Sequence, residues 1–268
     1  MKITLGADPE LFVTQKGKFR SAYGLIPGTK KDPFKVDCGA VQRDGMAAEF
    51  NIDPVDNEDD WVKNITTVMD QLKAMVPKHE FALVPSCKFH GSHFKNQPDE
   101  AKELGCDPDF NAYTLETNPR PDNNTTLRTA AGHVHVGFCE GADVTSPEHM
   151  QRCATLVKQL DCYLGLPSLL WDNDTKRRSM YGKAGAFRPK PYGVEYRVLS
   201  NAWLKNEKLM RLVFKYSNLA VENLLAGNRP FLDIGENKVI SSINRSYYPE
   251  PLIRKVPGIR LGEVYECL

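Results

Sequence analysis

The sequence predicts an α+β fold in which helices cover one face of an antiparallel or mixed sheet and leave a concave face open for an active site. Strand-like segments occur in pairs in the first half of the chain, and long amphipathic helices recur between the strands. Hairpins or long excursions separate the strands, in place of regular βαβ units. No internal repeat and no linker divides the chain, so we expect residues 1–268 to form a single domain.

The strand segments combine apolar runs with turn signals. Gly6 to Pro9 is expected to break the first strand, because proline has no N–H to donate to a sheet. Asp44-Gly45 between two apolar runs is a strong hairpin signal. The expected strands are residues 2–5, 10–14, 36–42, 46–52, 81–84, 132–137 and 193–199.

Capping residues accompany the helical periodicity. Asn57 is placed to cap the first long helix, and Ser146 to cap the second, with Pro147 in its first turn. The tail from Phe231 onward has no clear periodicity. Long helices are expected at 57–76, 146–164 and 206–226, and a loop at 24–34. Residues 88–124 are expected to form a polar excursion with short elements in it, and residues 172–191 are basic and Gly-rich.

Composition excludes several functional classes. The 268 residues include 35 basic and 34 acidic side chains, and this balance argues against a dedicated nucleic-acid binder. There is no transmembrane run and no signal-peptide pattern, so we expect no membrane partner. The seven cysteines are scattered without a C-x-x-C pair, which favours free thiols and a cytoplasmic location.

The segment Gly132 to Gly137 carries two histidines two residues apart among valines. Successive side chains of a strand point to opposite faces, so His133 and His135 share one face. A neutral imidazole is a common metal ligand. The alternative is a pair of hydrogen-bonded sheet histidines without a chemical role.

Three further strand segments place charged side chains in apolar surroundings. Charges are costly to bury unless they are paired or bound to metal, so we expect these groups to meet the histidines on one face. Carboxylates crowded in this way repel, and oxygen-rich ligands favour Mg²⁺ or Mn²⁺ as the ion that relieves the repulsion. The residues are Asp8, Glu10, Glu49, Glu195 and Arg197.

Four motifs in this order resemble the phage-type carboxylate-amine ligases, the COOH.NH2 ligase type 2 group, which belongs with glutamine synthetase and glutamate-cysteine ligase. The resemblance spans roughly residues 3–203. It implies a glutamine-synthetase-like catalytic domain that holds ATP and Mg²⁺ ions between strand-borne carboxylates and a histidine. The motifs are Gly6-Ala7-Asp8-Pro9-Glu10, Asp44-Gly45 with Glu49-Phe50-Asn51, Gly132-His133-Val134-His135-Val136-Gly137, and Tyr181-Gly182 with Ala186 to Arg197.

The resemblance also implies a role for each motif residue. Asp8, Glu10, Glu49, His133 and Glu195 correspond to metal ligands, although Asp8 is an aspartate where related ligases often have glutamate. His135 corresponds to a contact of the nucleotide phosphates, Glu49 to a metal or nucleotide carboxylate, and Arg197 to the arginine that faces the transferred phosphate.

The implied reaction joins a small-molecule or peptide carboxylate to an amine through an acyl phosphate. Arg188, Arg178 and Arg128 are further candidates for phosphate contact, and each has an alternative interpretation as a structural salt-bridge residue. Arg177, Lys176 and Lys190 are expected to be solvated charges.

Two other functions fit parts of the sequence. A metal-dependent hydrolase also uses His-x-His strands, and would turn over without ATP. A non-catalytic phage accessory protein could bind nucleic acid through the basic residues 176–190, but this interpretation leaves the inward carboxylates unexplained.

Overall fold

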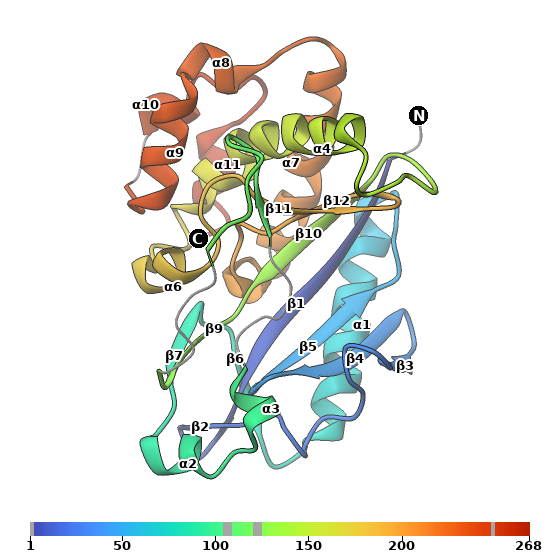
Figure 1. Cartoon of the computed structure of the whole chain (residues 1–268), viewed down its shortest axis with the longest axis vertical. Helices are drawn as coiled ribbons and strands as arrows, with labels where there is room; N and C mark the ends of the chain where they lie inside the picture. Colours follow the sequence, from blue (N-terminus) through green and yellow to red (C-terminus); the bar gives the residue numbers. More distant parts are fainter. Residues whose placement is uncertain (1–2, 104–108, 120–124, 248–249) are drawn as a thin grey trace.

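The computed structural model describes residues 3–103, 109–119, 125–247 and 250–268 (Figure 1). Twelve strands lie in these ranges. They are β1 (Thr4–Gln15), β2 (Lys18–Arg20), β3 (Phe34–Val36), β4 (Gly39–Asp44), β5 (Ala47–Ile52), β6 (Glu80–Ala82), β7 (Ser86–Lys88), β8 (Phe110–Asn111), β9 (Leu127–Thr129), β10 (Gly132–Gly137), β11 (Ala186–Lys190) and β12 (Gly193–Tyr196).

The helices follow the pattern predicted for an α+β protein. The long helices are α1 (Glu58–Met75), α4 (Pro147–Leu160) and α7 (Glu207–Leu225). Helix α4 continues through the π-helical η1 (Asp161–Gly165) into α5 (Leu166–Ser168), and η2 (Asn201–Lys205) is a 3₁₀ turn. The short helices are α2 (Gly91–Lys95), α3 (Asp99–Lys102), α6 (Thr175–Met180), α8 (Pro230–Ile234), α9 (Glu236–Asn244), α10 (Glu250–Ile253) and α11 (Leu261–Tyr265).

One large sheet organises the molecule, with the long strand β1 running diagonally through its middle (Figure 1). Its strand order is β3-β4-β5-β1-β10-β12-β11-β8, and β2 and β6 pair with the last part of β1. Strands β7 and β9 form a separate pair. Every strand pairing among the described residues is antiparallel, which agrees with the predicted fold class.

Side chains alternate along the strands, so the sheet has two different faces. One face packs into the apolar core, and the other, here called the chemical face, carries the charged residues. Leu5, Ala7 and Leu11 of β1 are buried in the main apolar core, together with residues of α1, α4 and α7. Asp8 and Glu10 point to the opposite face, as a period of two requires. This core extends from Leu5 to Cys267, so residues near both ends of the chain belong to one core.

The predicted hairpin is present as β4 and β5. Asp44 pairs with Ala47, which leaves Gly45 and Met46 as the connection. Gly45 adopts φ +56°, a backbone conformation that glycine accepts at little cost. The hairpin brings Glu49 opposite Glu10 of β1.

The predicted break at Pro9 does not occur, because β1 is continuous through it. Pro9 lies opposite Gly132 of β10, so that side of the strand stays paired. On the other side, β1 pairs with β5 at Glu10 and Leu11. Further along this side, Leu5 forms a bridge with Val55, which follows β5 in the sequence. Proline falls in the interval between these contacts, where its missing N–H removes no ladder bond.

Two further expectations need correction. Asn57 caps α1 as predicted, but the side chain of Ser146 makes no capping hydrogen bond at α4. The tail beyond Phe231, which has no clear periodicity, forms short helices whose buried side chains join the main core. No helix in the described ranges is long and apolar enough to cross a bilayer. The described cysteines are free thiols, and Cys106 lies outside the described residues.

Candidate functional site

Four adjacent strands carry the charged residues that the sequence analysis placed on one face. In the β1–β10 register Asp8 lies opposite His133, and in the β10–β12 register His135 lies opposite Glu195. Glu10 lies opposite Glu49 across β1 and β5. The expected convergence is therefore present in the structure.

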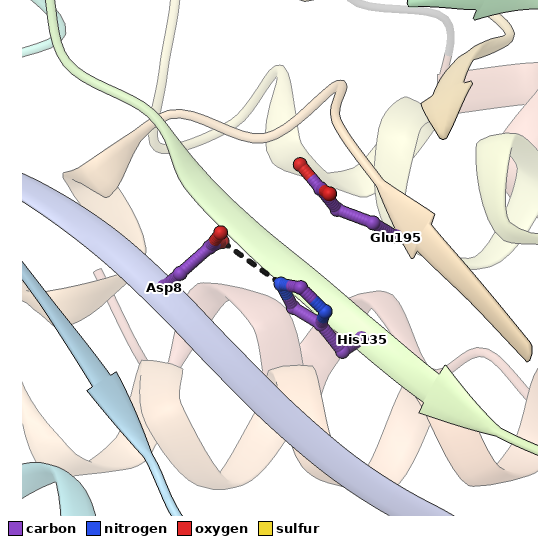
Figure 2. Close-up of side chains that lie close together, drawn as sticks. All are labelled: Asp8, His135 and Glu195. Carbon is purple, nitrogen blue, oxygen red and sulfur yellow. Dashed lines mark ion pairs between the residues drawn. The ribbon is translucent and has the colours of Figure 1, made fainter. Parts of the chain in front are cut away.

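Asp8, His135 and Glu195 form a group with the geometry of a cation site. One ligand atom from each residue lies within 4.8 Å of the others, and this is the only such group of three or more among the described residues. Figure 2 shows the three side chains converging from β1, β10 and β12, with the ion pair between His135 and Asp8 dashed. Two carboxylates and one imidazole suit Mn²⁺ or Mg²⁺.

Glu195 is fully buried and is surrounded by positive groups. Its carboxylate contacts the guanidinium of Arg197, the Lys190 Nζ at 2.8 Å and the Arg188 Nη1 at 3.5 Å. Burial alone would raise the pKa of Glu195, but Arg197 and the two histidines hold it well below its ordinary value. These positive neighbours therefore favour the ionised form of the carboxylate.

The two histidines of β10 differ in their partners. His133 Nδ1 lies 3.2 Å from Asp8 Oδ1 and 3.4 Å from Glu195 Oε1. Burial, with Arg197 nearby, lowers the pKa of His133 to about 4. Burial also opposes protonation of His135, but Asp8, whose Oδ1 lies 3.0 Å from Nε2, and Glu195 together raise its pKa.

A second carboxylate group lies beside the first. Burial and the neighbouring Asp44 raise the pKa of Glu10 to about 7, and the same causes raise the pKa of Glu49 well above its ordinary value. Gln42 donates to Glu49 at 2.7 Å, and Lys30 pairs with Asp44 at 3.0 Å. A divalent cation bound by Glu10 and Glu49 would relieve this repulsion, so these residues fit a second, oxygen-rich site.

Two cavities open on the chemical face. One, of about 220 Å³, is lined by Glu10 and by basic side chains that include Arg197, Arg188 and Lys30. The other, of about 440 Å³, is lined mainly by apolar surface and includes His135 and Tyr192. Asp8, Gln42 and Glu49 line both cavities, so the carboxylates lie at their junction.

The candidate arginines have different surroundings in the structure. Arg197 and Arg188 lie at Glu195, as expected of site residues. Arg128 lines the smaller cavity, but its guanidinium donates to the carbonyl oxygens of Lys102, Thr125 and Leu127. Arg128 therefore has a structural role whether or not it binds phosphate.

The assignment of Arg178 to phosphate contact needs correction. Its buried guanidinium lies 3.6 Å from Asp172 Oδ2 and outside the described lining of both cavities. Arg177 and Lys190, expected to be solvated, also differ from prediction. Arg177 is 1% exposed and lines the smaller cavity, and Lys190 pairs with Glu195.

Sequence reasoning missed three other residues of this region. Asp109 Oδ2 accepts from Arg197 Nε at 3.3 Å. Tyr192, at the tip of the β11–β12 hairpin, lies with its hydroxyl 2.5 Å from His135 Nδ1. Tyr181 lines the smaller cavity. Tyr181 and Tyr192 both lie in the last of the four motifs, and this was the signal available in the sequence.

The fold and the site define an antiparallel α+β protein with a candidate cation-binding centre on its sheet. Residues 115–246, somewhat less than half of the chain, match the family model described as Phage phiEco32-like COOH.NH2 ligase-type 2. The matched segment includes β10 and β12, whereas the acidic residues of β1 and β5 lie outside it. The similarity points to a carboxylate-amine ligase. No curated protein matches the chain.

Proposed function

We propose that the protein is an ATP-dependent ligase that joins a carboxylate to an amine. The observation that carries this proposal is the convergence of carboxylates from β1, β5 and β12 with the β10 histidines and Arg197. The family similarity supports the ligase class independently of the β1 and β5 carboxylates, which lie outside the matched segment. Membership of the glutamine synthetase superfamily stays a prediction.

Divalent cations fit two places in this site. Asp8, His135 and Glu195 would hold one ion, and Glu10 with Glu49 would hold another. Bound Mg²⁺ or Mn²⁺ would neutralise phosphate charge and orient the transferred group. The protein's own part includes holding Glu195 ionised and in place, which the basic groups around it do.

The two cavities suit different reactants. The mainly apolar cavity beside Tyr192 suits the nucleotide, whose base needs apolar surface. The smaller cavity suits the carboxylate substrate, because three buried hydrogen-bond donors that line it have no partner among the described residues. These are Tyr181 Oη, Arg128 Nε and Arg177 Nε.

Arg197 lines the smaller cavity and contacts Glu195. Its guanidinium is held by Asp109 and Glu195, so its charge is preorganised where phosphate would be transferred. Preorganised charge stabilises a transition state without a reorganisation cost. In the proposed reaction the carboxylate attacks the γ-phosphate of ATP, and the amine then displaces phosphate from the acyl phosphate.

The reaction is tested by incubating the purified protein with Mg-ATP and fractions of a bacterial extract. ADP release should require two co-substrates, and mass spectrometry should find a product that has gained the amine and lost water. Glu10→Gln should abolish this activity, while Glu263→Gln, which changes a carboxylate paired with Lys215, should not. Turnover without ATP would indicate a hydrolase instead.

A further inference from the structure

The larger cavity of the chemical face differs from the smaller one in its charge. None of the described residues that line it is a lysine or an arginine, whereas Lys30 and Arg197 line the smaller cavity. Its basic side chain is His135, which pairs with Asp8, and Glu49 adds a second carboxylate. An anionic group would therefore find no free counter-charge here, and a volume of about 440 Å³ suits a neutral organic group.

Two glycines, Gly6 and Gly137, line this cavity from paired strands, although glycine weakens a strand. Gly137 has a reason within the fold, because a Cβ there would lie 2.3 Å from Thr4 Oγ1. Gly6 does not have a positive φ, and the nearest atom to a Cβ there would be His135 Cβ at 3.6 Å, an ordinary contact. The fold therefore accepts a side chain at Gly6, and its absence keeps space for a ligand.

Asn51 brings a carboxamide to the same cavity. It follows Glu49 by two residues in β5, so both side chains lie on the chemical face. Strand β5 runs antiparallel to β1 with Glu49 opposite Glu10, which places Asn51 further along, toward Gly6 (Figure 1). The Asn51 amide makes no hydrogen bond to any described residue. A single polar group of this kind, beside apolar surface, orients a ligand and selects it.

A carboxamide distinguishes between purine bases. It offers one acceptor and one donor, which match the N6 amino group and the N7 acceptor of adenine. The same edge of guanine presents two acceptors, N7 and O6, which call for arginine or lysine, and neither lines the described part of this cavity. Tyr192, which is 40% exposed, adds aromatic surface on which a base can stack.

We propose that the adenine base of ATP lies against Gly6 in the larger cavity and that Asn51 is the residue that selects it. The inference rests on the proposed function, because it takes the nucleotide of the ligase to be ATP. The phosphates then extend toward Asp8 and Glu49, where the two cavities meet.

The experiment titrates the full-length protein calorimetrically, in the presence of Mg²⁺, with non-hydrolysable analogues of ATP and GTP. The wild type should bind the ATP analogue at least about 10-fold more tightly, as expected for one bidentate base contact. Asn51→Ala should weaken binding of the ATP analogue and remove this preference. Gly6→Ala should weaken binding of both analogues by about 10-fold or more, because a methyl group takes space that the base needs.

Gly262→Ala, in α11, is the matched control. A Cβ at Gly262 would meet no atom within 4 Å, and Gly262 lines neither cavity. Both glycine variants should unfold at or above the temperature of the wild type, because alanine narrows the unfolded ensemble. Weaker nucleotide binding by Gly6→Ala at an unchanged or raised Tm therefore reports occupied space and not a damaged fold.

Equal affinities of the wild type for the two analogues, or an unchanged preference in Asn51→Ala, would overturn the role of Asn51. Unchanged affinities in Gly6→Ala would overturn the position of the base. In each of these cases the wild type still binds the ATP analogue, so the proposed ligase function would stand. A wild type that binds neither analogue would contradict the ATP dependence of the proposed function, and this inference with it.

Discussion

Glu195 is the carboxylate that pairs with Arg188, Lys190 and Arg197 in the candidate site. Glu195→Gln would leave Arg197 and Lys190 near a neutral group in a buried environment. Removing one partner of a buried ion pair costs about 3–5 kcal/mol. We therefore expect the free energy of unfolding, measured by urea denaturation with EDTA present, to fall by this order.

Glu236→Gln is the control, because it also removes the charge of a carboxylate that pairs with a lysine. Glu236 pairs with Lys158 at 2.9 Å, but 34% of its side chain is exposed. Partly solvated pairs contribute only about 0–1 kcal/mol, so this variant should remain close to the wild type. Equal losses in the two variants would contradict the central place of Glu195.

Single residues also show how far the sequence could predict the site. Strand alternation alone placed His133 and His135 on one face, and the structure has them there. Alternation says nothing about Arg177, which was expected to be solvated. Its guanidinium donates to the carbonyl oxygens of Val198 and Leu199, contacts between segments that only the complete fold brings together.

At the scale of elements, the two predicted helix caps give a direct comparison. Asn57 Oδ1 accepts from the Asp60 N–H at 2.9 Å, whereas Ser146 makes no such bond. Loss of an N-cap bond costs about 1 kcal/mol. Asn57→Ala should lower the free energy of unfolding by about that amount in urea denaturation, and Ser146→Ala should change it little. A larger loss for Ser146→Ala would contradict the assigned caps.

Elements were predictable where the signal was local. The Asp44-Gly45 hairpin and the three long helices follow from turn chemistry and periodicity, and all are present. The continuous β1 was not predictable, because whether Pro9 breaks a strand depends on which neighbour its missing N–H faces. The short helices after Phe231 are stabilised by burial in the core, so they have little periodicity of their own.

At the scale of the whole molecule, Asp161 links parts of the chain that lie far apart. Its carboxylate accepts from Tyr196 Oη at 2.7 Å, from Tyr113 Oη at 2.9 Å and from the Gly185 N–H at 2.8 Å. The π-helical turn, the β12 strand and the loop before β11 therefore meet at one buried carboxyl group. The network lies on the helix-covered face, behind Glu195.

This carboxyl group makes the stability of the molecule depend on pH. Burial raises the pKa of Asp161 from 3.8 to about 7, against the opposing effect of the hydrogen bonds. The folded state then holds this proton more tightly than the unfolded state, so stability falls as pH rises from about 4 to about 7. A shift of this size corresponds to about 4 kcal/mol.

Asp161→Asn removes the titrating group, and Tyr196→Phe keeps it while deleting one hydrogen bond. Urea denaturation at pH 4 and pH 8 should show the wild type losing about 4 kcal/mol more than Asp161→Asn between these values, because only the carboxyl group must ionise against burial. Tyr196→Phe should lose at least as much as the wild type. Parallel pH profiles for the wild type and Asp161→Asn would show that this group ionises freely in the folded protein.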